Sequence, residues 1–144
     1  LREDGDARVD HYEQIHELDC AGENVRSLQG LEHLSGLEDL DIRGAPVTDL
    51  AVLESLEKLE ELDIAETRVS RLQPLAYHAS LERIRLRGNS IESIEPLLTI
   101  ESLEWMSPPE RLGFDCHNEK DELERLQAQD ELEIDGEPRW IDCA

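Results

Sequence analysis

Residues 31–74 decide the fold, because they carry the same frame of 22 residues twice in succession. They read LEHLSGLEDLDIRGAPVTDLAV from Leu31 to Val52 and LESLEKLEELDIAETRVSRLQP from Leu53 to Pro74. Apolar residues occupy the same places in both copies, in the pattern L-x-x-L-x-x-L-x-x-L-x-I-x-x-x-x-V-x-x-L. A unit this short cannot bury its own apolar edge, so it must stack on copies of itself.

The same frame continues on both sides of this stretch, over residues 9–108. Six apolar columns recur in steps of 22 residues: Val9, Leu31, Leu53, Leu75 and Leu97; Ile15, Leu37, Leu59, Leu81 and Leu103; Leu18, Leu40, Leu62, Ile84 and Met106; Cys20, Ile42, Ile64 and Leu86; Val25, Val47, Val69 and Ile91; Leu28, Leu50, Leu72 and Ile94. We therefore predict a short solenoid of about five repeats, with any function on its repeated outer faces.

The frame resembles the leucine-rich repeat of the 22-residue class that occurs in bacterial internalins and in a eukaryotic protein phosphatase regulator. The resemblance implies an α/β fold: a right-handed solenoid with a short parallel sheet of about five strands on its concave side. It also implies protein recognition as the generic role. The asparagine that usually follows the strand is kept only at Asn89, with Glu23, Ala45 and Thr67 in the same column. A continuous asparagine ladder is therefore not expected.

Each repeat divides into a strand and a return segment. The L-x-I core alternates with a period of two, and a glycine follows it at Gly22, Gly44 and Gly88, which indicates a short strand ending in a turn. The Leu-x-x-Leu-x-x-Leu stretch between strands predicts an α-helix or a 3₁₀ helix on the opposite, convex side.

Three segments are expected along the chain. Residues 1–8 carry no apolar period and predict a mobile lead-in, and residues 9–108 form the repeats. Residues 109–144 predict a C-terminal cap that covers the last open edge of the solenoid. Within the cap we expect a helix over 118–129 and an alternating stretch at 131–135 with Leu132 and Ile134 on one face.

The composition narrows the range of partners. The chain of 144 residues has 36 acidic and 14 basic residues, for a formal net charge of -22. Nucleic acids and anionic membranes both require a basic surface, so neither is an expected partner. A charged protein partner should carry a basic patch. Adaptation to high salt would also favour an acidic, lysine-poor surface, and the sequence leaves both explanations open.

The clearest functional signal lies between the core residues of the strands. Alternate side chains of a strand point to opposite faces, so these residues face outward on the concave side. The candidate partner-binding residues are Glu17, Asp19, Asp39, Asp41, Arg43, Glu61, Asp63, Arg83, Arg85, Arg87 and Trp105. We expect Arg83 and Arg85 to offset Glu61 and Asp63, because parallel strands of neighbouring repeats lie about 4.8 Å apart. Stacking of Glu17 on Asp39 and of Asp19 on Asp41 is expected to remain uncompensated.

Catalysis is not expected, and neither is a cofactor. The five histidines fall in different columns, and the side chains of Cys116 and His117 point apart because the two residues are adjacent. No metal site is expected either. A stack of Asp19, Asp41 and Asp63 would supply about three oxygens, whereas Ca²⁺ takes six to eight.

The three cysteines do not indicate a disulfide framework. Cys20 falls in a core column and is expected to be a buried, unreactive thiol. Cys116 and Cys143 could pair, which the sequence does not decide. The chain begins at Leu1 rather than Met, from which we expect a fragment of a larger product. The sequence favours the cytoplasm only slightly and leaves secretion or surface exposure open.

Together these features predict a non-enzymatic bacterial module that binds another protein through a charged concave face. One version is an acidic inhibitor or immunity-type protein that covers a basic enzyme, an analogy based on charge alone. The alternative is a repeat arm or targeting fragment of a larger surface or effector protein.

Overall fold

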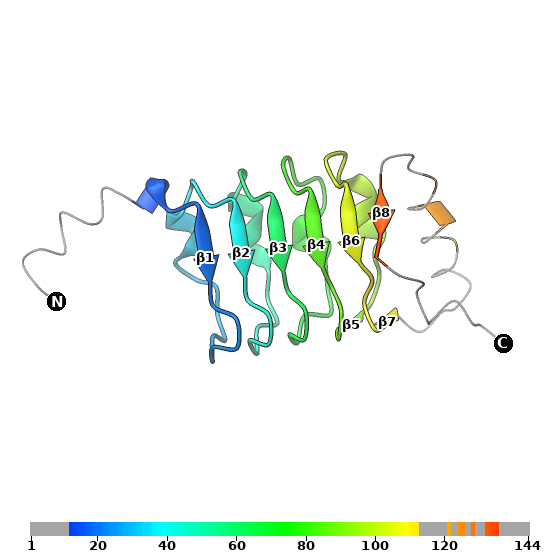
Figure 1. Ribbon diagram of the computed structural model, residues 1–144, viewed down its shortest axis with the longest axis horizontal. Coiled ribbons are helices and arrows are strands. Elements are labelled where there is room, and N and C mark those ends of the chain that lie inside the picture. The colour runs from blue at the N-terminus through cyan, green and yellow to red at the C-terminus, as the bar shows by residue number, and fades with distance from the viewer. Residues whose placement is uncertain (1–11, 113–120, 122–123, 126–127, 129–131, 136–144) are drawn as a thin grey trace, which may run out of the picture.

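The strands of successive repeats lie side by side in a computed structural model, which describes residues 12–112, 121, 124–125, 128 and 132–135 (Figure 1). They form one parallel sheet in the order β1-β2-β3-β4-β6-β8. The strands are β1 Glu17–Asp19, β2 Asp39–Asp41, β3 Glu61–Asp63, β4 Arg83–Arg85, β6 Trp105–Ser107 and β8 Glu133–Ile134. From β1 to β6, each strand is offset from the next by one repeat of 22 residues, so the predicted frame sets the register there.

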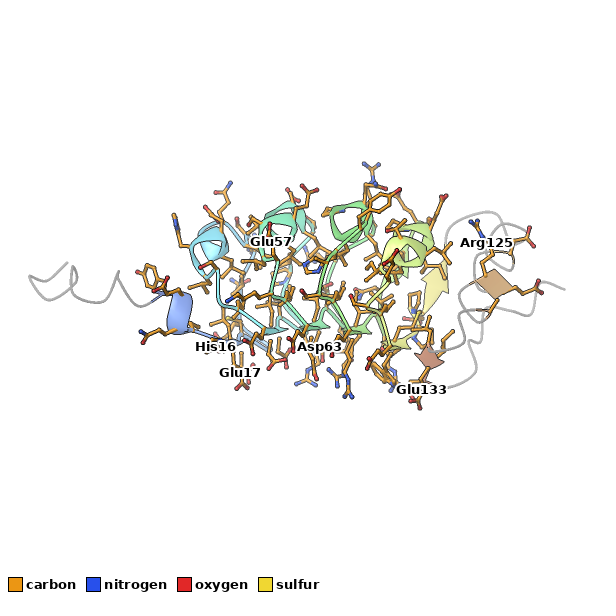
Figure 2. The ribbon with its side chains drawn as sticks, turned by 90° about the horizontal axis from the view of Figure 1, so that it is seen from above. His16, Glu17, Glu57, Asp63, Arg125 and Glu133 are labelled. Atoms are coloured by element: carbon orange, nitrogen blue, oxygen red, sulfur yellow. The ribbon has the colours of Figure 1, made fainter. Side chains whose placement is uncertain are left out.

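The return segments lie on the other side of the sheet and are 3₁₀ helices (Figure 2). These are η1 Tyr12–Gln14, η2 Leu31–His33, η3 Ala51–Ser55, η4 Gln73–Leu75 and η5 Glu95–Thr99. Pro74 and Pro96 occupy the first turns of η4 and η5, where a missing N–H costs nothing. A second parallel pair joins β5 Ser90–Ile91 to β7 Arg111–Leu112. Among the described residues, no helix has the length and apolar character needed to cross a membrane.

The apolar columns form one continuous core between the strands and the 3₁₀ helices. Leu37, Leu59 and Leu81, which share a column, are fully buried. Burial is less complete at the start of the stack, where Ile15, Leu18 and Cys20 of the first repeat are partly buried against the core. The expectation that Cys20 is fully buried was therefore wrong. Burial, followed by the charge of Asp19, raises the pKa of its thiol and keeps it protonated.

The cap supplies a sixth strand, one more than the sequence led us to expect. β8 pairs with β6 in parallel, and the N–H groups of Glu133 and Asp135 donate to the carbonyls of Glu104 (2.8 Å) and Met106 (2.9 Å). Leu132 and Ile134 pack against the core, as their alternation predicts. The interaction of the Arg87 guanidinium with the Asp135 carboxylate (3.5 Å) also joins β4 to this strand.

Only part of the predicted cap helix can be compared with the structure. Asp121, Glu124 and Arg125 are helical, and the N–H of Ala128 donates to the carbonyl of Glu124 at 3.0 Å. The lead-in at 1–8 and the remaining residues of the 118–129 helix lie outside the described residues. So do Cys116 and Cys143.

Thr67 and Asn89 form a short side-chain ladder in the column where the leucine-rich repeat pattern usually has asparagine. The Asn89 side chain donates from Nδ2 to the carbonyls of Ile64 (2.6 Å) and Leu86 (3.1 Å). The Thr67 hydroxyl, one repeat earlier, donates to Ile64 O at 2.9 Å and lies 3.1 Å from Asn89 Oδ1. The ladder thus has two rungs, consistent with the expectation that it is not continuous.

Replacing Leu62 with Asp should unfold the chain. Leu62 is fully buried in β3, which has a paired strand on either side, so an unpaired carboxylate there would cost at least about 4 kcal/mol. Chemical denaturation followed by circular dichroism measures the effect. Glu60→Gln, two residues away on the surface, is the control and should leave the denaturation midpoint nearly unchanged. A Leu62→Asp variant with the melting temperature of the parent chain would contradict the stacked core.

Candidate protein-binding face

Nine of the eleven predicted surface residues lie in two rows across the sheet, and Arg43 and Arg87 follow the ends of β2 and β4. The first row runs through Glu17, Asp39, Glu61, Arg83, Trp105 and Glu133. The second runs through Asp19, Asp41, Asp63, Arg85 and Ser107. Each residue is the register partner of the next, so the order of charges in the sequence becomes an order of charges in space.

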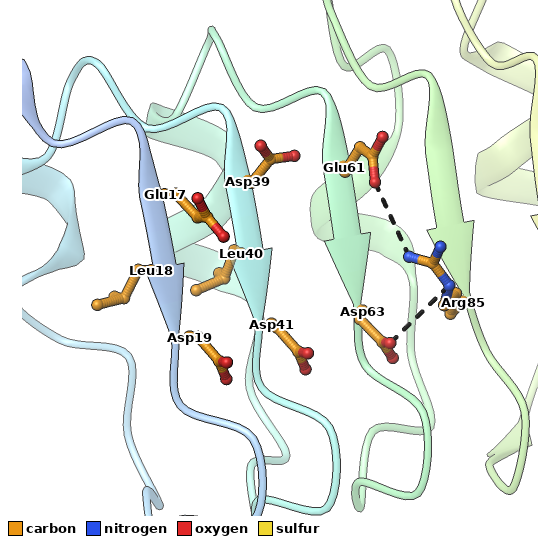
Figure 3. Close-up of a pocket in the computed structure, with 9 residues that line it drawn as sticks. All are labelled: Glu17, Leu18, Asp19, Asp39, Leu40, Asp41, Glu61, Asp63 and Arg85. Atoms are coloured by element: carbon orange, nitrogen blue, oxygen red, sulfur yellow. Dashed lines mark ion pairs between the residues drawn. The ribbon is translucent and has the colours of Figure 1, made fainter.

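A hollow of about 260 Å³ opens on the acidic half of the face (Figure 3). It is lined by Glu17, Leu18, Asp19, Asp39, Leu40, Asp41, Glu61, Asp63 and Arg85. Carboxylates from three successive strands thus line the hollow, Arg85 lies at one end, and the side chain of Leu40 is buried in the core beneath it. Such a surface can receive the positive charge of an extended cationic side chain near its carboxylates.

The arginines of β4 compensate the carboxylates of β3, as the sequence led us to expect. Arg83 Nε lies 3.8 Å from Glu61 Oε1. Arg85 lies between two carboxylates, with Nη1 at 3.9 Å from Glu61 Oε2 and Nε at 4.0 Å from Asp63 Oδ2. The Asp63 side chain is only 8% exposed, so its ion pair is less screened by water than the others.

Arg43 compensates a carboxylate that we expected to be uncompensated. It follows β2, and its Nη2 lies 3.4 Å from Asp41 Oδ2, while its Nη1 lies 4.0 Å from Asp63 Oδ2. The sequence predicted that Asp19 and Asp41 would both be uncompensated. Strand order alone does not show that the Arg43 side chain turns back toward Asp41 of its own repeat. Within the described part of the chain, Glu17, Asp19 and Asp39 have no cationic group within 4.0 Å.

The aspartate row also has a structural role that the sequence reasoning missed. Asp19, Asp41 and Asp63 each accept, through Oδ1, the N–H of the residue two positions later. These Asx turns, of 2.9 to 3.0 Å, end each strand and direct the chain into a turn with a positive φ at Gly22, Gly44 or Glu66. An aspartate two to three residues before that turn was the available signal. The other carboxylate oxygen of Asp41 and of Asp63 pairs with arginine.

A further acidic row, also missed, precedes the strands. It consists of His16, Glu38, Glu60, Glu82 and Glu104, again at steps of 22 residues. His16 Nδ1 lies 3.1 Å from Glu38 Oε1 at the first rung. Burial, then the charges of Glu82 and Glu38, raises the pKa of Glu60. The row therefore extends the negative potential of the face beyond the strands.

Repulsion on the face is most evident at Asp39. Burial raises the pKa of its carboxyl above the ordinary value, and the charges of Glu61, Glu17 and Glu38 raise it further. A raised pKa means that the folded protein destabilises the ionised carboxylate relative to water. The acidic half of the face is thus an arrangement that a cation would stabilise.

The other half of the face presents an aromatic ring already fixed by a cation. The Arg85 guanidinium lies over the Trp105 indole, 5.3 Å from its ring centroid. This stacking and the two ion pairs of Arg85 join β3, β4 and β6 through one side chain. Beside the ring, Arg83, Glu104, Trp105 and Glu133 line a separate shallow hollow. Among the described residues, no cluster of three His, Cys, Asp or Glu side chains could hold a metal ion.

Similarity to solved structures bears on the fold. The structure superposes on crystal structures of internalin C2 and of the internalin InlF, both from Listeria monocytogenes. For internalin C2 the TM-score is 0.54 at 21% identity, over 72% of this chain and 55% of that one. For InlF it is 0.50 at 19% identity, over 88% of this chain and 48% of that one.

The chain has the fold of an internalin-like leucine-rich repeat. It spans about half the length of each of these two internalins. No family model matches the sequence, and no curated protein matches it. The similarity therefore shows the fold of this chain but does not show what the chain binds.

Asp39→Asn should stabilise the folded chain at pH 7 by about 0.5 kcal/mol at low salt, because it removes a charge opposed by its neighbours across the strands. The folded-state pKa of Asp39 is raised, so its destabilising effect is absent at low pH and develops as the pH rises through that pKa. The gain from the substitution should therefore disappear in acid. Urea titrations at pH 7 and pH 3 measure both values.

Asp41→Asn is the matched control for this prediction. It removes the ion pair with Arg43 and should not stabilise the chain. Equal gains from the two substitutions would show that nonspecific reduction of the net charge, rather than repulsion at Asp39, is responsible.

Proposed function

We propose that this leucine-rich repeat is a non-catalytic protein-binding module that holds a partner on its concave face. The partner presents basic side chains to β1–β3 and an acidic group to the arginines of β4. The observation that carries this proposal is the order of charge across the sheet. Carboxylates without a cationic neighbour gather at one end, while arginines and an aromatic ring gather at the other.

The two halves of the face differ in how far their charges are paired, which supports different roles for them. Glu17, Asp19 and Asp39 have no cation among the described residues, so a basic partner would relieve repulsion already present in the folded chain. Electrostatic attraction of this kind mainly increases the association rate and makes it dependent on salt. The acidic half therefore attracts and orients the partner.

The half around Trp105 supports the role of anchor. Tryptophan and arginine are the residues most enriched at the energetic centres of protein interfaces. Stacking on Arg85 restricts the indole before a partner arrives, which lowers the entropy lost on binding. Trp105 should consequently contribute more to the lifetime of the complex than any single carboxylate.

A second candidate function is a repeat arm within a larger protein. It is favoured by the length of the two internalins, because this chain aligns with only about half of each. An arm and a free-standing inhibitor would use the same concave face. The coding sequence around these repeats distinguishes them: a contiguous further domain supports the arm, and an adjacent gene for a basic toxin-like protein supports the inhibitor.

Two synthetic peptides of identical composition test the proposal. In one, three lysines are separated from two glutamates by a Gly-Ser-Gly spacer, and in the other the same residues are scrambled. Fluorescence anisotropy with the intact chain should give at least tenfold tighter binding for the ordered peptide, with affinity falling as salt is raised. Trp105→Ala should weaken that binding by about 2 kcal/mol.

Arg125→Glu is the control, because Arg125 is exposed on the cap and away from the sheet. It should leave binding unchanged although it makes the net charge more negative. Arg85→Glu makes the same change of charge on the face and should weaken binding by about 2 kcal/mol. It should also destabilise the chain, since Arg85 pairs with Glu61 and Asp63. Equal affinity for both peptides, or for Trp105→Ala and the parent chain, would contradict the proposal.

A further inference from the structure

The turn after η4, on the convex side, departs from the repeat pattern. Tyr77 there is 80% exposed and has a φ of 60°, in the left-handed region that favours glycine. The same column holds His33, Ser55 and Thr99 in the other repeats. The turn is fixed by a hydrogen bond from the Tyr77 N–H to the Thr99 hydroxyl (2.7 Å), which in turn donates to Pro96 O (2.6 Å). An aromatic ring is thus held outward in a conformation that it disfavours.

A hollow of about 290 Å³ lies beside this ring. It is lined by Glu54, Glu57, Pro74, Ala76, Tyr77, His78 and Ala79. The two alanines explain it, because Ala76 and Ala79 occupy the columns in which the preceding repeat has Glu54 and Glu57. One repeat therefore supplies small side chains and its neighbour supplies carboxylates. Figure 2 shows Glu57 on the side of the 3₁₀ helices, away from the concave-face residues Glu17 and Asp63.

His78 completes the wall without adding charge. It replaces the Leu34, Leu56 or Ile100 of other repeats and is buried. Its Nδ1 accepts the N–H of Leu81 at 3.2 Å, so the hydrogen is on Nε2, which donates to Leu56 O at 3.0 Å. Burial lowers the pKa of His78, which keeps the ring neutral at pH 7. The charge of the hollow consequently comes from two exposed glutamates.

We infer that this convex hollow is a second binding site, which receives an arginine side chain of a protein partner. A guanidinium can lie over the face of Tyr77 while pairing with Glu54 or Glu57, and aromatic rings and carboxylates are its two preferred contacts. Neither glutamate has an ion pair within the described residues, so both are available. Ala76 and Ala79 leave room for the aliphatic part of the side chain. The site is separate from the concave face and does not depend on the function proposed for it.

An NMR titration of the full chain with the peptide acetyl-GRGRGRG-amide locates this binding. The ring resonances of Tyr77 and the amide of Ala79 should shift in a saturable way. The glutamate peptide acetyl-GEGEGEG-amide should leave them unmoved. Tyr77→Gly should weaken the interaction at Ala79 at least tenfold and yet raise the melting temperature, because glycine adopts this φ without strain. A purely structural tyrosine would not show that combination.

Matched variants separate this site from nonspecific attraction to an acidic chain. Glu57→Gln should weaken the binding seen at Ala79 at least threefold. Glu101→Gln, in the same column two repeats later, should leave it within twofold. Trp105→Ala, which disrupts the concave face, should also leave these shifts unchanged. Shifts confined to the concave face, or equal losses for Glu57→Gln and Glu101→Gln, would overturn the inference.

Discussion

Stacking of apolar columns between successive repeats is the interaction on which the rest of the structure depends. Strands of two or three residues and 3₁₀ helices of three to five have too little internal hydrogen bonding to persist alone. Leucine side chains from neighbouring repeats enclose one another and make these short elements stable. Burial is complete in the middle of the stack and partial in its first repeat, as expected when each repeat contacts only its neighbours.

The charged face follows from this stacking. Because the core fixes the register, side chains one repeat apart become neighbours about 4.8 Å apart, and a row of carboxylates forms even though they repel. Arginines on β4 and after β2 offset part of the repulsion, and what remains is concentrated at β1 and β2. The free energy of the core therefore maintains a surface that a basic partner would stabilise.

The period of 22 residues was sufficient to predict the solenoid, the sheet, the core and the two rows of the face, because all of these follow from the position within a repeat. Features that depend on a single side chain or on a departure from the repeat were not predicted. Arg43 turns back toward Asp41, and Tyr77 adopts a left-handed conformation. The alternation at 131–135 indicated a strand in the cap, but not that it pairs with β6, because residues 133–134 lie outside the frame that sets the register. Only three-dimensional contacts determine such features.

Amide hydrogen exchange of the intact chain, measured residue by residue by NMR, tests most directly whether stacking holds the fold together. The N–H of Ile64 donates to Arg85 O (3.1 Å) inside the stack, and that of Cys20 donates to Asp41 O (2.7 Å) in the first repeat. We predict at least tenfold slower exchange at Ile64 than at Cys20, although the Cys20 hydrogen bond is shorter, because stability comes from neighbouring repeats. Exchange at Ile64 as fast as in an unfolded chain, or faster than at Cys20, would contradict this account.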